Sequence, residues 1–127
     1  MTFIVGFGLR QSATIESLQN AFLKVSEDLP VSAISILGEK AMHPAFSEFS
    51  RLLGIPVILL EKENLHGIET DTRSELIEQK FSVGSVAEAV AIAAQEPFGQ
   101  LYRGRQVSVD GLATAAVAHF SATQGDY

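Results

Sequence analysis

Short apolar runs alternate with amphipathic segments along the chain, which predicts an α/β fold. Residues 3–7, 33–37 and 57–60 are almost wholly apolar, as is typical of strands that are buried on both faces of a sheet. We therefore expect the run 57–60 to be a central strand. Each of the first two runs is followed by a helical pattern, which favours right-handed crossovers and parallel pairing. After the first run, Gly8 is expected to open a loop.

Helix boundaries are indicated by capping residues. Thr14 is expected to be the N-cap of the first helix, Pro44 suits the first turn of the second, and Gly54 suits its end. Capping boxes that begin at Thr72 and Ser85 predict two further helices, and the last is apolar nearly all round and so expected to be buried. The predicted helices cover residues 15–26, 44–53, 62–65 (a single turn), 72–80 and 86–95.

The end of the chain has a different pattern. Residues 100–103 and 112–120 are predicted to be strands around the turn Asp110-Gly111, which makes an antiparallel hairpin and a mixed sheet. The whole pattern predicts a single three-layer α/β/α domain over residues 1–127. Its sheet is expected to be mixed, mostly parallel and made of about five strands.

Composition narrows the function classes. The chain has 127 residues, which suits one domain, and it has no cysteine, which excludes disulfides, thiolate catalysis and cysteine-bound metals. Its net charge of −6 provides no general basic field for nucleic acid or a membrane surface. No leader peptide is recognisable, and the apolar run 55–60 is far too short to span a membrane. We expect a cytoplasmic protein.

Four basic residues are nevertheless expected near the carboxyl ends of strands, the edge where open α/β sheets bind ligands. The glycines after the first strand are expected to turn the backbone towards a ligand, and a helix N-terminus adds positive field. The implied ligand is an anion with several carboxylates or phosphates, and the alternative is an ordinary solvated surface. The predicted binding residues are Gly6, Gly8, Arg10, Lys40, Ser85, Arg103 and Arg105.

Other motifs argue against familiar chemistry. Gly6-Phe7-Gly8 begins like a dinucleotide fingerprint, but position 11 is Gln instead of a third glycine. The three histidines fall in separate elements, so neither a metal site nor a cofactor is expected. No Gly-x-Ser-x-Gly elbow is present. The candidates for acid–base catalysis are the loop residues Glu39, His43 and Asp110.

Several segments, in this order, resemble the CobE family of cobalamin biosynthesis, which is shared with the C-terminal domain of the CbiG proteins. They are Val5-Gly6-Phe7-Gly8-Leu9-Arg10, Glu39-Lys40, Gly84-Ser85-Val86-Ala87-Glu88-Ala89 and a basic strand end before the last strand. The chain departs from the family pattern at Leu9, where a cysteine is common, and at Gln11, where a basic residue is common. Arg103 stands where a lysine is usual.

The resemblance implies an accessory protein of the aerobic pathway that binds or carries an anionic tetrapyrrole, of the precorrin or hydrogenobyrinic acid type. Such molecules carry many acetate and propionate carboxylates. In the CbiG group the family activity opens a lactone of a cobalt-precorrin, but this chain has only the shared domain, so independent catalysis is not expected. The alternatives are a hydrolase-like precorrin-processing enzyme and a docking module for a pathway methyltransferase or another cobalamin-pathway enzyme.

Overall fold

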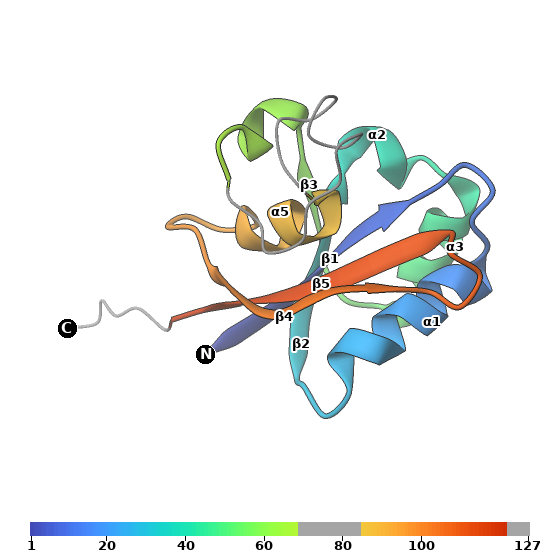
Figure 1. Ribbon diagram of the computed structural model, residues 1–127, viewed down its shortest axis with the longest axis horizontal. Coiled ribbons are helices and arrows are strands. Elements are labelled where there is room, and N and C mark those ends of the chain that lie inside the picture. The colour runs from blue at the N-terminus through green and yellow to red at the C-terminus, as the bar shows by residue number, and fades with distance from the viewer. Residues whose placement is uncertain (69–84, 122–127) are drawn as a thin grey trace.

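The computed structural model describes residues 1–68 and 85–121, which build one five-stranded sheet in the order β3-β2-β1-β5-β4 (Figure 1). The strands are β1 (Thr2–Leu9), β2 (Val31–Leu37), β3 (Val57–Leu60), β4 (Gln100–Val107) and β5 (Ala113–Phe120). The helices are α1 (Ile15–Ser26), α2 (Gly38–Ala41), α3 (Pro44–Leu53), the 3-10 turn η1 (Lys62–Leu65) and α5 (Val86–Ile92). The helix predicted over 72–80 lies outside the described residues.

The sheet is mixed, as the sequence predicts. β1 pairs with β2 and β2 with β3 in parallel, whereas β5 is antiparallel to both β1 and β4. Parallel pairs are therefore two of the four, fewer than a mostly parallel sheet requires. Since β5 is the one strand that runs the other way, β4 points in the same direction as β1.

The prediction that β3 is central is wrong. β3 is an edge strand, and its Val57 and Leu59 side chains are 37% and 57% exposed. An apolar run indicates a strand, but edge strands and central strands can have the same composition. The run therefore does not show which strands lie beside it in the sheet.

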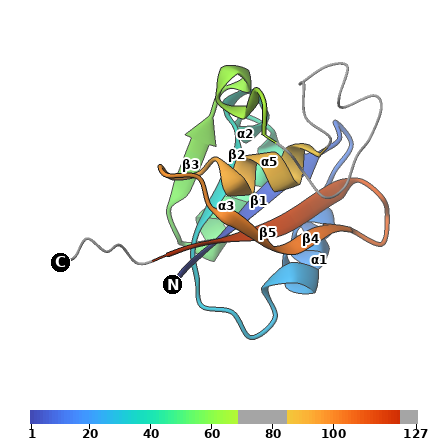
Figure 2. The ribbon, with the colours of Figure 1, turned by 60° about the vertical axis from the view of Figure 1, so that its left-hand side comes forward.

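The two faces of the sheet are covered by different helices (Figure 2). On one face α1 and α3 pack over the odd-numbered side chains of β1, including Val5 and Phe7. On the other face α5 packs over Ile4 and buries an Ala- and Val-rich surface. Ser35 of β2 donates its hydroxyl to the Val90 carbonyl of α5 at 2.8 Å, so this buried polar group is satisfied.

Local signals place most helix ends. Thr14 and Ser17 form a capping box at α1, and α3 ends at Gly54 with a φ of 74°, a conformation that favours glycine. Three elements differ from prediction. α2 was expected to be loop, α5 ends at Ile92 instead of near residue 95, and β4 continues to Val107.

Gly6 and Gly8 lie inside β1, so the expected loop at Gly8 is wrong. A Cβ on Gly6 would stand 2.6 Å from the backbone N of Ala91. On Gly8, a Cβ would meet the Thr114 hydroxyl at 2.8 Å and the Ala87 N at 3.9 Å. Gly6 therefore lets α5 approach the sheet closely and is covered by that helix, whereas at Gly8 the close neighbour is Thr114 of β5. Among the described residues, no helix is long and apolar enough to cross a membrane.

Candidate functional site

The carboxyl ends of β1 and β2 lie side by side and carry two of the predicted cations. Arg10 directly follows β1 and is exposed, and Lys40 lies in α2, directly after β2, and is half-buried. Within residues 1–68 and 85–121, neither side chain makes a hydrogen bond or an ion pair. Glu39, also in α2, is exposed beside them. Parallel pairing thus brings Arg10 and Lys40 to one edge of the sheet, as the sequence predicts.

Arg103 and Arg105 do not end a strand but lie in the middle of β4. The Arg103 guanidinium donates to the carbonyl oxygens of Val25 and Glu27, at 2.9 and 3.0 Å, and so satisfies the C-terminal end of α1. It also lies over the Tyr102 ring, 5.6 Å from its centroid. Arg103 therefore supports α1, and its guanidinium is already bonded within the protein.

Arg105 is half-buried, and its side chain makes no hydrogen bond or ion pair with any residue that the structure describes. Its backbone N–H donates to Oε2 of Glu88 in α5, at 2.8 Å. The Glu88 side chain is wholly buried. The sequence analysis missed this contact because it assigned Glu88 to a capping box; the available signal was a single acid in an otherwise apolar helix.

Ser85 is the N-cap of α5, as predicted. Its hydroxyl accepts a hydrogen bond from the Glu88 N–H, at 3.3 Å, and the residue is buried. The hydroxyl is used by the helix, and the buried Ser85 exposes no side chain to a ligand.

His43 joins two loops at this edge. Its Nδ1 accepts a hydrogen bond from the Ala45 N–H, at 3.1 Å, as the N-cap of α3. Since Nδ1 is the acceptor, Nε2 carries the proton and donates to the Gln11 carbonyl at 2.7 Å. Both ring nitrogens are thus occupied, which suits a structural bridge better than a catalytic base.

Asp110 organises the hairpin between β4 and β5. Its carboxylate accepts hydrogen bonds from the Ser108 and Ser17 hydroxyls, both at 2.6 Å, and from the Leu112 N–H at 3.0 Å. These bonds, from Ser108 first and then Ser17, lower the pKa of Asp110 below its ordinary value. A carboxyl held ionised in this way is a poor general acid and ties the hairpin to the N-terminal turn of α1.

Stability is expected to fall in acid through this group. Because the pKa of Asp110 is lower in the folded state, its contribution is fully present above the unfolded value and is lost as the pH falls through the folded value, below about pH 4. Removing a donor with Ser108→Ala is expected to raise the pKa of Asp110 in a carboxyl-carbon NMR titration. An unchanged titration curve would contradict this assignment of cause.

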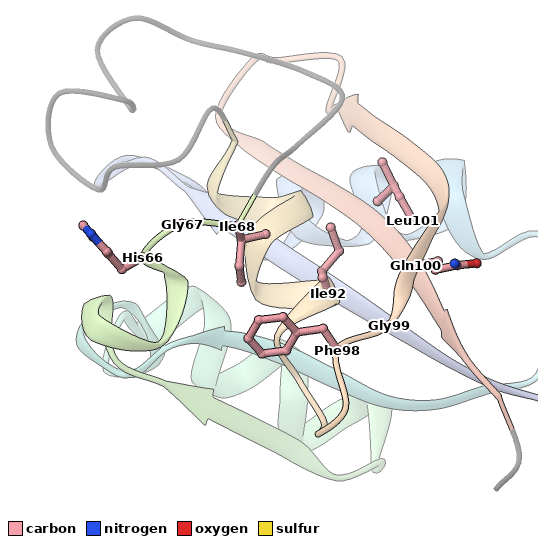
Figure 3. A pocket seen from close by; sticks show the side chains of 8 residues that line it. All are labelled: His66, Gly67, Ile68, Ile92, Phe98, Gly99, Gln100 and Leu101. Carbon is pink, nitrogen blue, oxygen red and sulfur yellow. The ribbon is translucent and has the colours of Figure 1, made fainter. Parts of the chain in front are cut away.

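A separate cavity of about 400 Å³ lies beside the C-terminal half of α5 (Figure 3). The side chains of Ile68, Ile92 and Phe98 face one another in it, whereas the imidazole of His66 and the amide of Gln100 point outward. None of the predicted cations lines it. The cavity therefore offers none of these cations to a carboxylate-rich ligand. Among the described residues, no three histidine or carboxylate side chains are grouped to hold a metal ion.

Comparisons with known proteins agree on one relationship. The family model described as "Cobalamin synthesis G C-terminus" matches residues 3–118. A crystal structure of CobE, a protein from the cobalamin (vitamin B12) biosynthetic pathway, is 22% identical, with a TM-score of 0.82 over 97% of this chain and 93% of that one. The cobalamin biosynthesis protein chiG from Agrobacterium tumefaciens is also 22% identical, with a TM-score of 0.72 over 94% of this chain and 99% of its own. At this identity the two structures show the shared fold. No curated protein matches the chain.

Proposed function

The chain belongs to the cobalamin synthesis G C-terminus family, that is, the CobE/CbiG family of cobalamin biosynthesis proteins, and we propose that it binds an anionic corrin or precorrin intermediate at the carboxyl edge of its sheet. The observation that carries the proposal is that the side chains of three cations, Arg10, Lys40 and Arg105, have no partner in the described part of the chain. Binding or carrying the intermediate, without independent catalysis, is the proposed activity.

Unpaired cations are notable in this chain because acidic groups are plentiful. The sequence has 15 Asp and Glu against 9 Lys and Arg. Acidic residues that could pair with Arg10 and Lys40 are therefore present in the sequence, and Arg51 does form an ion pair, with Glu48 on α3. Cations that are left without an acidic partner keep their charge for a ligand, and guanidinium groups bind carboxylates in two-bonded geometry.

The arrangement suits an anion with several carboxylates more than a single small anion. Arg10 and Lys40 follow neighbouring strands, and Arg105 lies on β4, separated from β1 by β5. Charges that come from separate strands, two at the carboxyl edge and one on β4, match a macrocycle with acidic substituents on its rim. Arg103, which the sequence analysis included, is left out of the proposed site because its guanidinium is bonded to α1.

Processing of the ligand by the chain has less support. Of the three candidate acid–base residues, His43 and Asp110 are held in structural hydrogen bonds, which leaves Glu39 alone at the edge. The test therefore includes a measurement of turnover. A spectral change of the precorrin that continues at catalytic amounts of protein would favour an enzyme, and a stoichiometric change a carrier.

The proposal predicts salt-sensitive binding of hydrogenobyrinic acid, measured by calorimetric and spectral titration. Arg10→Ala and Lys40→Ala are each expected to weaken binding by about 1–3 kcal/mol, roughly tenfold to a hundredfold in Kd. Added salt is expected to weaken wild-type binding because the edge is open to solvent. The matched control is Arg51→Ala, which removes a paired arginine from the exposed face of α3 and is expected to leave the affinity unchanged.

Two outcomes would overturn the proposal. One is the absence of binding by the wild-type protein to hydrogenobyrinic acid and to earlier precorrins at low salt. The other is equal affinity in the wild type, Arg10→Ala and Lys40→Ala, which would place the ligand elsewhere and leave protein–protein docking as the better explanation.

A further inference from the structure

An extra residue in β4 separates its two arginines. Between Arg103, which pairs with Val117, and Gln106, which pairs with Ala115, β4 has one residue more than β5. This is a β-bulge, a feature that re-aims side chains. Without it, Arg103 and Arg105 would be two residues apart in a regular strand and would point to the same face.

The register shows that the bulge breaks the alternation of faces beside Arg105. Val117 and Ala115 belong to the core beneath α1, and directly opposed residues of an antiparallel pair share a face. Arg103 and Gln106 therefore both lie on the α1 face, although they are three residues apart in the strand. A Cβ on Gly104 would face Oε2 of Glu88 in α5, so the step at which alternation fails adjoins Arg105. The conformation of the bulge at Arg105 therefore sets the direction of its side chain.

Glu88 contacts the bulge at two successive residues. Its Oε2 accepts the Arg105 N–H at 2.8 Å, and a Cβ on Gly104 would stand 3.2 Å from the same oxygen. Glycine at position 104 therefore leaves room for the carboxylate. A wholly buried carboxylate is costly, and a bulged strand leaves a backbone group without its ladder partner. The bond between Glu88 and Arg105 gives the bulge amide an acceptor and contributes to the stabilisation of the buried carboxylate.

We propose that Glu88 is a positioning residue whose buried carboxylate holds the β4 bulge and so sets the direction in which the Arg105 guanidinium is presented to an anionic ligand. This inference rests on the proposed function for the identity of the ligand. The bulge itself, and its dependence on Glu88, are independent of any ligand.

Two variants distinguish the loss of the hydrogen-bond acceptor from a change in the volume of the side chain. Glu88→Met keeps a long side chain in the same space but has no strong acceptor for the Arg105 N–H. Glu88→Gln keeps an acceptor oxygen and is expected to restore what Glu88→Met loses. Urea denaturation of both variants identifies any loss that comes from unfolding.

The ligand-independent measurement is amide hydrogen exchange at Arg105. We expect protection of this amide in the wild type and in Glu88→Gln, and faster exchange in Glu88→Met at urea concentrations and pH where the protein stays folded. Unchanged protection in folded Glu88→Met would overturn the positioning role, whatever the protein binds.

The ligand-dependent measurement is a double-mutant cycle with hydrogenobyrinic acid. Glu88→Met and Arg105→Ala are each expected to weaken binding roughly tenfold and to reduce its salt dependence by the same amount, and the double variant is expected to bind no more weakly than Arg105→Ala. In a protein that carries Arg10→Ala, by contrast, Glu88→Met is expected to weaken binding by the same factor as in the wild type.

The outcomes distinguish the two proposals. Additive losses in the cycle with Arg105→Ala would show that Glu88 acts through another group, and would overturn this inference while the binding function stands. A wild-type protein that does not bind, but that loses Arg105 protection in Glu88→Met, would overturn the proposed function and retain the positioning of Arg105.

Discussion

Substitution of Gly6 by alanine is expected to lower the free energy of unfolding by about 3 kcal/mol, the upper part of the usual range for overpacking. The added Cβ would stand 2.6 Å from the backbone N of Ala91 and 2.8 Å from Cγ2 of Val90. A backbone atom in a helix cannot rotate away, so α5 as a whole must move off the sheet. The measurement is urea denaturation monitored by circular dichroism.

Gly8→Ala is the matched control on the same face of the same strand. There the nearest atom is the Thr114 hydroxyl at 2.8 Å, which belongs to a side chain, and the nearest α5 backbone atom is 3.9 Å away. We expect a clearly smaller loss of stability than at Gly6. Equal losses at the two positions, or a loss below about 1 kcal/mol at Gly6, would contradict the close approach of α5 to the strand.

Phe7→Ala is expected to cost about 3–5 kcal/mol, because the substitution opens a large cavity in the core under α1 and α3. Phe7 is wholly buried, and its ring lies 6.2, 6.1 and 5.4 Å from the rings of Phe22, Phe46 and Phe49, measured between centroids. Three neighbouring aromatic rings cannot collapse into the space without leaving their own contacts. Thermal and urea unfolding would measure the loss.

The control for Phe7 is Phe98→Ala, which removes the same ring from a position where half of the residue is exposed. Its expected cost is below about 1.5 kcal/mol, since less apolar surface returns to water. A loss at Phe7 no larger than that at Phe98 would contradict the assignment of Phe7 to the centre of this core.

Gly6 and Phe7 are neighbours in sequence that meet opposite requirements. The α5 face needs the smallest residue because a helix backbone lies directly on it, and the α1 face needs a large ring because three phenylalanines surround it. For the proposed site the first requirement matters more. Close seating of α5 on β1 brings Glu88 to the bulge in β4, where its carboxylate accepts the Arg105 N–H.

Features that depend on a few neighbouring residues could be predicted. α1 runs over the residues that the pattern indicates, because its Thr14 cap and its apolar spacing are both local. The same is true of the start of α3 at Pro44 and its end at Gly54. Helix caps and turns are completed by hydrogen bonds within about four residues, so the sequence contains both partners side by side.

The candidate site could be predicted only in part. Arg10 and Lys40 were placed correctly because the end of a buried parallel strand is itself a local signal. Arg103 and Arg105 were wrongly predicted to lie at the end of a strand, because β4 continues to Val107. The irregular part of β4 is a β-bulge, which is set by the pairing of β4 with β5 and leaves no mark on the period of β4 alone. The partner of Glu88 lies 17 residues away in the chain, beyond the reach of any capping rule.

The sequence by itself determined the α/β elements, the mixed sheet, the family resemblance and the two cations at the ends of β1 and β2. Only the tertiary structure decided that β3 is an edge strand, that Gly6 seats a helix and Gly8 continues β1 instead of opening a loop, and that a β-bulge lies between Arg103 and Gln106. The physical reason is the range of the interactions. Helix periodicity and capping act over one turn, whereas strand order, register and helix–sheet contact join segments tens of residues apart, and their partners are chosen by packing.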